Sequence, residues 1–302
     1  MKRFKNILVV YDALPGGEEA LHKAITLAKR NDAHLTLLNV VNPAQGWEHL
    51  DEQKHLIKRV ATGIPLPSDR KNHHVVLGTS IYEILGAADD CKADLIITSD
   101  GYVGYYEQLF GLDVTTDVIR KAACPVWVVH ARSTSNYHRV VAAVNAGKKD
   151  ALNCPTNRRI LEMASSLAKM EHAELHVVYA WDFEGQDQNV MANGLSPNEY
   201  AERLEMGRLN SLSQVFGLIK HVLDDPTTCI PVVARGEPAE TILNYIAENK
   251  ADILVTDGKV GEPFVSAFTS TTATQFLCKS SCSVIFAKPG PKQQLYELHG
   301  AA

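Results

Sequence analysis

The two halves of the chain carry the same sequence landmarks in the same order. Each half has apolar runs, a Leu-Ala-Lys segment, an Ala-Asp pair, an Asp-Gly pair and a Cys shortly before its last apolar run. The matching segments are 7–13 and 140–146, 27–29 and 167–169, 35–41 and 175–180, 93–98 and 251–256, 100–104 and 257–261, and 124–126 and 282–284. This self-similarity indicates two copies of one structural unit, joined head to tail.

Within each copy, short runs of Val, Ile and Leu alternate with longer segments of helical period. The runs are apolar on successive residues, which predicts strands buried on both faces and therefore a parallel sheet covered by helices. In the first copy we expect strands at 6–11, 35–41, 73–78, 94–99 and 125–130, with helices near 17–31, 48–61, 80–92 and 113–123. In the second copy we expect strands at 138–145, 173–180, 229–234, 251–256 and 283–288, with helices near 156–171, 197–216, 238–249 and 271–280.

A polar stretch between the copies predicts the domain boundaries. Residues 131–137 lie between the last strand of one copy and the first strand of the next, and they include Ser133, Thr134 and Ser135. Small hydroxyl residues in such a position are typical of a linker. We therefore expect a first domain at 1–132, a linker at 133–137, a second domain at 138–289 and a C-terminal tail at 290–302.

Composition and charge narrow the functional classes. The net charge is -5 and the sequence pI is about 6.2, so the chain lacks the basic excess that binding to nucleic acid requires. No apolar run reaches the roughly 20 residues of a bilayer span. The N-terminus leads directly into the apolar run 7–10, which favours a strand over a signal peptide and predicts a cytoplasmic protein. The 6 cysteines have irregular spacing without a CxxC pair, which predicts reduced, mostly buried thiols.

The chain offers no pattern for catalysis or for metal binding. His73 and His74 are adjacent in a predicted strand, so their side chains point to opposite faces and cannot chelate together. Cys278 and Cys282 are not accompanied by a second pair of ligands. A G-x-S-x-G elbow and a P-loop are both missing from the sequence. We therefore expect neither an enzyme nor a metal protein.

Three features together resemble the universal stress protein family, in its tandem form with two domains in one chain. The first strand ends in an acid at Asp12, a glycine-containing loop follows the fourth strand, and a helix leads into the run 124–129. The resemblance implies a Rossmann-like, five-stranded parallel sheet in each domain, with helices on both faces. It also implies that the domains pair through their fifth strands, 126–129 and 284–287. Such pairing would remove two apolar strand edges that are otherwise prone to aggregation.

Nucleotide-binding members of this family have an Asp after the first strand and a G-x2-G-x9-G-[ST] loop after the fourth. Ligands of doubly wound sheets lie beyond the carboxyl ends of the strands, where glycines allow close approach of the backbone. The resemblance therefore places candidate contacts at Asp12, Ala13, Val41, Gly101, Gly104 and Gly111 in the first copy, and at Asn145, Ala180, Gly258, Gly261, Ser270 and Thr271 in the second.

Each copy departs from the family's nucleotide pattern. In the first copy, Thr98 stands at the first glycine position and Asp113 follows Gly111, where its carboxylate would repel a phosphate. In the second copy, Asn145 replaces the acid and Ser270 stands where the last glycine is expected. Both sites are therefore expected to be degenerate.

We expect a cytoplasmic stress-response module with a binding or regulatory role and without enzymatic activity. Two alternatives remain open. One is an ATP-binding regulator with one functional site and slow hydrolysis. The other is a binder of a non-nucleotide, amphipathic ligand in the second domain, suggested by Phe264, Val265 and Phe268. A small-molecule ligand and a homodimer also remain open, whereas ATP is not assigned as a resident cofactor.

Overall fold

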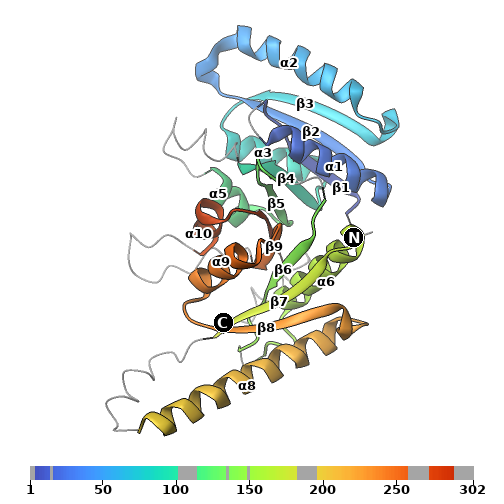
Figure 1. Ribbon diagram of the computed structural model, residues 1–302. Helices are drawn as coiled ribbons and strands as arrows, with labels where there is room; N and C mark the ends of the chain where they lie inside the picture. Colours follow the sequence, from blue (N-terminus) through green and yellow to red (C-terminus); the bar gives the residue numbers. More distant parts are fainter. Residues whose placement is uncertain are drawn as a thin grey trace, which may run out of the picture. The chain divides into compact units, whose positions relative to one another are not determined.

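The computed structural model describes residues 4–13, 16–100, 114–133, 136–147, 150–181, 196–257 and 272–288. The chain divides into two compact units, which are treated separately below. Unit 1 consists of Met1–Asn136 together with Gly258–Ala302, and unit 2 consists of Tyr137–Asp257. In both units helices flank a sheet (Figure 1), as the sequence predicts for an α/β protein.

The sheet of unit 1 has the strand order β3-β2-β1-β4-β5-β10. All neighbours from β3 to β5 are parallel, whereas β10 is antiparallel to β5. The helix α1 packs on β1, β2 and β4, and α3 packs on β1, β2 and the helix α5. The elements are β1 (Asn6–Val10), α1 (Gly17–Asn31), β2 (His34–Val41), α2 (Gly46–Gly63), β3 (Lys71–Leu77), α3 (Ser80–Asp90), β4 (Leu95–Ser99), α5 (Val114–Lys121), β5 (Val126–Val129), α10 (Thr272–Lys279) and β10 (Ser283–Ala287).

The sheet of unit 2 has the order β9-β6-β7-β8, and all its neighbours are parallel. The helix α6 packs on β6, β7 and β9, while α8 packs on β7 and β8 and α9 packs on β7. The elements are β6 (Arg139–Ala143), α6 (Pro155–Glu171), β7 (Glu174–Trp181), α8 (Pro197–Val222), β8 (Cys229–Arg235), α9 (Pro238–Asn249) and β9 (Ile253–Asp257). The predicted strands and helices are therefore confirmed, with α8 differing most from its predicted length.

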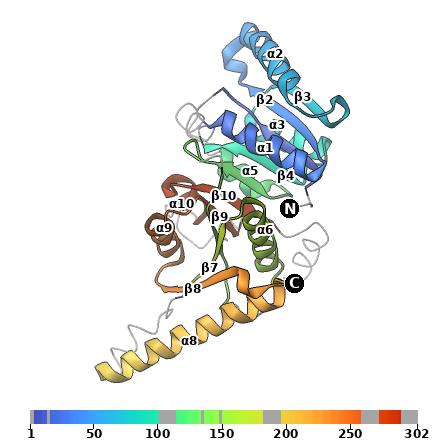
Figure 2. The same cartoon turned by 45° about the vertical axis from the view of Figure 1, so that its right-hand side comes forward.

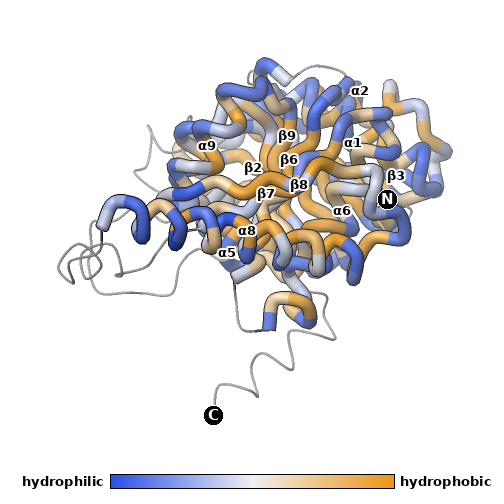
Figure 3. The backbone as a smooth tube through the Cα atoms, turned by 60° about the horizontal axis from the view of Figure 1, so that its bottom comes forward, coloured by the Kyte–Doolittle hydropathy of each residue, from blue (hydrophilic) through white to orange (hydrophobic). Residues whose placement is uncertain are grey.

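The core explains why the successive apolar runs form strands. The apolar side chains of β1 and β4 are almost completely buried, and so are those of β6 and β9. Figure 3 shows the central strands at the hydrophobic end of the scale. Because both faces of these strands are covered, their sequences lack the alternation typical of a half-exposed sheet.

The two copies share unusual backbone conformations as well as sequence landmarks. The described non-glycine residues with positive φ are Asp32, Lys92, His172 and Lys250, with φ between 49° and 56°. Asp32 follows α1 and His172 follows α6, the corresponding first helix of the second copy. Lys92 lies after α3, and Lys250 lies directly after α9. A left-handed residue at a helix end satisfies carbonyl groups of the last turn, so both copies end these helices in the same way.

One repeated aspartate anchors the amino end of the first strand in each copy. The Asp94 carboxylate accepts hydrogen bonds from the backbone N–H groups of Lys5, at 2.6 Å, and Asn6, at 3.1 Å. Asp252 accepts equivalent bonds from the backbone N–H groups of His138, at 2.7 Å, and Arg139, at 2.8 Å. The repeated Ala-Asp landmark therefore has a structural role at the amino end of the sheet.

Antiparallel pairing joins β5 to β10. Val128 lies opposite Val284, and Trp127 lies opposite Ile285. The hydroxyl of Ser283 accepts a hydrogen bond from the backbone N–H of His130, at 3.1 Å. The last strands of the two copies are thus paired, as the resemblance implies. This pairing also explains why the end of the second copy falls within compact unit 1, so that the units differ from the domains delimited in the sequence.

The helix α8 extends to Val222 instead of ending at residue 216, the predicted end. Gly217 disfavours a helix by about 1 kcal/mol relative to Ala. Leu218 and Ile219 nevertheless continue the helix because both side chains are fully buried. No helix within the described ranges combines the length and the apolar character that a membrane span needs.

Among the cysteines in the described ranges, Cys124, Cys229 and Cys282 are buried, whereas Cys91 and Cys154 are partly exposed. Burial raises the pKa of the Cys124 thiol to about 12, which keeps it protonated and unreactive at neutral pH. The side chain of Cys278 lies outside the described part of the chain.

The anchoring aspartates give a first prediction. Asp94→Ala and Asp252→Ala should each lower the free energy of unfolding by about 1–3 kcal/mol, because each leaves two strand N–H groups without their acceptor. The free energies are measured by urea denaturation. Asp89→Ala is the matched control, since Asp89 is exposed on α3, and it should change stability by less than about 0.5 kcal/mol. Equal losses in all three variants would contradict the anchoring role.

Candidate functional site

The candidate site of unit 1 lies at the carboxyl end of β1. Asp12 follows this strand and is half-buried, and the neighbouring Ala13 is exposed. The side-chain amide of Asn39, on β2, donates a hydrogen bond of 3.0 Å to the backbone carbonyl of Tyr11. This bond holds the end of β1, so the position of Asp12 is set by the sheet beneath it.

Gly16 brings the loop after β1 down onto the ends of two other strands. Its φ of 95° is left-handed, and a Cβ there would lie 3.1 Å from Ala131 Cα and 3.2 Å from Ser99 Cβ. Ser99 ends β4, and Ala131 follows β5. Glycine meets both requirements, because it adopts positive φ without strain and has no side chain. The carboxyl ends of β1, β4 and β5 are therefore in close contact at this edge.

Asp12 also packs against the start of α1. A Cβ at Gly17 would lie 2.2 Å from the Asp12 backbone oxygen and 2.9 Å from its Oδ1. The other carboxylate oxygen, Oδ2, is shielded from solvent. A carboxylate at the N-terminus of a helix interacts favourably with the helix dipole. In this structure Asp12 therefore interacts with the N-terminus of α1, and only part of its carboxylate is exposed.

Acidic groups gather near the same strand ends. The Tyr11 hydroxyl donates a hydrogen bond to Glu18 in the first turn of α1. Burial, and next the bond to Glu18, raise the pKa of Tyr11 well above its usual range. Asp100 follows β4, accepts a hydrogen bond of 2.8 Å from the backbone of Ala131, and lies 3.5 Å from His130 Nε2. Together with Asp12, these carboxylates oppose an anionic ligand at this edge.

The predicted strand-end contacts Val41 and Ala180 have buried side chains, so only their backbone could reach a ligand. The carbonyl of Val41 already accepts a hydrogen bond from the Gly78 backbone, at 3.1 Å. Thr98, at the first glycine position, has a buried hydroxyl without a hydrogen-bond partner among the described residues, and it faces a small apolar cavity with Val10. This hydroxyl lies in the core under the strand ends.

Several sequence-predicted contacts cannot be placed. Those that lie outside the described residues are Gly101, Gly104, Gly111, Gly258, Gly261, Ser270 and Thr271. The apolar residues proposed for an amphipathic ligand, Phe264, Val265 and Phe268, also lie outside them.

In unit 2 the counterpart of Asp12 is held by a residue that the sequence analysis missed. Asn157, on α6, accepts a hydrogen bond of 3.0 Å from the Asn145 backbone and donates one of 2.8 Å to the Asn145 carbonyl. It donates another to the Ala151 carbonyl, at 3.2 Å. Asn157 is almost fully buried, and a polar residue near the start of a helix, directed at the core, was the available signal. The side chain of Asn145 itself is exposed.

An aromatic side chain supports the same loop of unit 2. The Tyr179 hydroxyl lies so near Gly147 that a Cβ there would be only 2.0 Å away. Tyr179 is on β7, at the position that Asn39 has on β2 in the first copy, and Gly147 follows β6. The loop after β6 is therefore packed on a phenol ring that the first copy lacks.

We tested the fit of a nucleotide against these residues. Unit 1 retains a carboxylate, Asp12, at the end of the first strand, where the nucleotide-binding pattern of the family has an acid. Unit 2 has an amide at Asn145, and Tyr179 lies beneath the loop. The described residues of unit 2 therefore do not fit.

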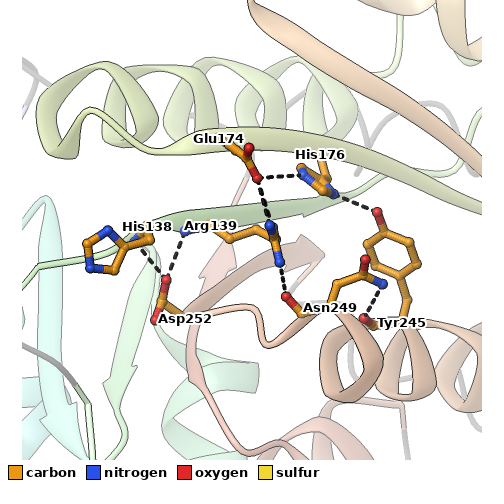
Figure 4. A network of polar contacts seen from close by, with 7 residues as sticks. All are labelled: His138, Arg139, Glu174, His176, Tyr245, Asn249 and Asp252. Carbon is orange, nitrogen blue, oxygen red and sulfur yellow. Dashed lines mark hydrogen bonds and ion pairs between the residues drawn. The ribbon is translucent and has the colours of Figure 1, made fainter.

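A polar network crosses the amino end of unit 2 (Figure 4). Arg139 donates to the Glu174 carboxylate at 3.1 and 2.8 Å, and it also donates to the backbone carbonyl of Asn249. Glu174 Oε2 lies 3.5 Å from His176 Nε2, and His176 Nδ1 is 2.5 Å from the Tyr245 hydroxyl. The network joins β6, β7 and α9 at the edge opposite the candidate site.

Burial lowers the pKa of His176, and the positive charge of Arg139 acts in the same direction. Glu174 opposes both effects without overcoming them. The folded protein therefore favours the neutral form of His176, which bonds to Tyr245. Among the described residues, no group of three or more His, Cys, Asp or Glu side chains could hold a metal ion.

Comparison with known sequences identifies the family to which this fold belongs. The model of the universal stress protein family matches residues 3–130 and again residues 136–288. The chain belongs to the universal stress protein family. It is similar to universal stress protein E of Escherichia coli (strain K12), with 22% identity over 99% of this chain and 98% of the relative. It is also similar to a universal stress protein E homolog of Haemophilus influenzae, with 22% identity over 96% of this chain and 99% of the relative.

Solved structures agree on the fold of this tandem universal stress protein. A protein of Pseudomonas aeruginosa UCBPP-PA14 has a TM-score of 0.68 and 18% identity, covering 100% of this chain and 99% of that one. A universal stress protein from Archaeoglobus fulgidus DSM 4304 has a TM-score of 0.58 and 17% identity, covering 95% and 97%. At this level of identity the likeness establishes the Rossmann-like α/β fold.

The contact between Gly17 and Asp12 predicts that a side chain at position 17 destabilises the protein. Gly17→Ala should lower the free energy of unfolding by about 1–3 kcal/mol, because the new Cβ meets a backbone oxygen that cannot move alone. Gly86→Ala, in the middle of α3 with nothing within 4 Å, should instead stabilise by about 0.5–1 kcal/mol. Thermal or urea denaturation distinguishes the two. A neutral Gly17→Ala would mean that the loop after β1 is not held against α1.

The buried His176 predicts a pH dependence. Its pKa in the folded state is below the unfolded value of 6.5, so the stability it contributes is present above pH 6.5 and is lost as the pH falls toward the folded pKa. His176→Gln cannot ionise, and it should lose less stability than the wild type between about pH 7.5 and about pH 5.5. Urea denaturation at the two pH values measures this difference. The exposed-site control His73→Gln should follow the wild type.

Proposed function

We propose that this tandem universal stress protein is a stress-response module with a binding or regulatory role, whose nucleotide sites have degenerated. The observation that carries the proposal is the structure of the loop after β6. There Asn157 makes three hydrogen bonds to backbone groups, and Gly147 packs on Tyr179. Backbone that is held by side chains of α6 and β7 has little freedom to rearrange around a nucleotide.

The described titratable groups support a role without catalysis. Catalytic groups usually combine a shifted pKa with a position in a cleft. Three of the shifted groups, Tyr11, Cys124 and His176, are instead part of the packing, and burial is the main cause of the pKa shift in each. We assign no catalytic residue.

The retained Asp12 favours one alternative, an ATP-binding regulator that uses unit 1 alone. Its carboxylate stands at the carboxyl end of β1, where ligands of doubly wound sheets bind. The packing of Asp12 on Gly17 and the nearby carboxylates of Glu18 and Asp100 count against this alternative.

Calorimetry separates the two proposals. Isothermal titration of the full chain with ATP and Mg²⁺, up to about 1 mM nucleotide, should show no saturable heat. A saturable heat signal that corresponds to one ATP per chain, and that disappears in the variant Asp12→Asn, would favour the ATP-binding regulator. Glu48→Gln, at an exposed acid in the first turn of α2, is the matched control for a general loss of negative charge.

A further inference from the structure

The helix α8 has apolar residues on two sides. One side faces the sheet of unit 2 and includes the buried residues Val215, Leu218 and Ile219. The other side carries Met206 and Phe216, which are 71% and 41% exposed. At about 100° per residue, Met206 points about 180° away from Val215, and Phe216 points about 100° away from it. A surface helix of a monomer normally has one apolar stripe, so the second stripe needs a different explanation.

The outer stripe has the spacing of a helix-pairing seam. Met206, Leu209, Ser213 and Phe216 are separated by three, four and three residues, as at the a and d positions of a heptad. Leu209 is 49% exposed, and Ser213 is also exposed. Figures 1 and 2 show α8 running past the end of β8, with its N-terminal half away from the sheet. Met206, Leu209 and Phe216 are each exposed within the described part of unit 2.

We propose that the outer stripe of α8 binds the same stripe of a second copy of this chain, with the two helices antiparallel. A twofold axis near residue 211 places Met206 opposite Phe216 of the other copy, and Leu209 opposite Ser213. These are pairings of a with d positions, and the small Ser213 leaves room for Leu209. An isologous contact of this kind closes on itself and gives a dimer.

Charge complementarity selects the antiparallel arrangement. Glu202 and Lys220 extend the stripe by one position at each end, and both are exposed. About the same twofold axis, Glu202 lies opposite Lys220 of the other copy, at both ends of the interface. A parallel pair would instead place Glu202 against Glu202 and Lys220 against Lys220. Like charges at such flanking positions disfavour a pairing, so the ends of the stripe specify both direction and register.

The distribution of exposed apolar side chains favours α8 over other surfaces. Trp47 and Tyr82 are 74% and 72% exposed, but each is the one large exposed apolar residue of its helix among the described residues. On α8, three such residues lie along one line. The helix has 26 residues and is therefore about 39 Å long at 1.5 Å per residue. This length suffices for a helix pair, and a pair of this size is smaller than a standard stable interface.

Sedimentation velocity on the full chain tests the proposal from about 1 µM to about 200 µM, the range in which a small interface dissociates. The wild type should shift from monomer to dimer. Met206→Glu combined with Phe216→Glu should stay monomeric at every concentration. Trp47→Glu combined with Tyr82→Glu is the matched control, because it adds the same two charges at isolated exposed positions, and it should dimerise like the wild type. Circular dichroism verifies that each variant is folded.

A charge exchange tests direction and register. Glu202→Lys should weaken dimerisation about tenfold or more, since two attractive contacts become repulsive. Adding Lys220→Glu to that variant should restore the dimer, because the opposite charges face each other again. A wild type that is monomeric throughout, a dimer unaffected by the Met206 and Phe216 changes, or a charge exchange without restoration would each overturn the proposal. Each of these results can be obtained whether or not the chain binds nucleotide, so the dimer and the proposed function are tested separately.

Discussion

Backbone hydrogen bonding between β5 and β10 is the interaction on which the organisation of unit 1 depends. The side chains of β5 are apolar and buried, including Trp127, and an apolar strand with an open edge is a site of aggregation. Pairing with β10 closes that edge and brings the last described residues of the chain into the first compact unit. The neighbouring ends of β4 and β5 then provide the surface on which Gly16 packs. The geometry of the candidate site thus follows from the pairing of the sheet.

The two copies share an anchoring aspartate at their amino ends and differ in the contacts at their carboxyl ends. Asp94 and Asp252 make the same bonds to the first strand of their copy, and the left-handed helix ends recur at matched positions. At the carboxyl ends, Asp12 packs on a glycine in one copy, whereas Asn145 is held by Asn157 in the other. In doubly wound sheets the carboxyl ends carry ligand specificity. The described contacts at the carboxyl ends therefore differ between the copies, while both copies keep the aspartate that anchors the first strand.

Outer surfaces and buried groups have separate roles in unit 2. The network of Arg139, Glu174, His176 and Tyr245 joins strands to α9, and the shifted pKa of His176 follows from that packing. The outer stripe of α8 contributes nothing to this core, yet it is apolar and regularly spaced. Hydrophobic exposure without a role in folding is most simply explained by association with another chain. The long helix therefore combines a structural side with a binding side.

The sequence by itself determined the duplication, the order and type of the elements and the family, because apolar periodicity and landmark order are local properties of the chain. It also showed that Asn145 stands in the second copy where the first copy has Asp12. Only the tertiary structure revealed that Gly16 packs on Ser99, that Tyr179 lies against Gly147 and that Leu218 and Ile219 prolong α8 past Gly217. These facts depend on which segments meet across loops, and hydrogen bonds or contacts between distant residues leave no periodic trace in the sequence. The side of α8 that faces the sheet was decided in the same way, by packing against β8.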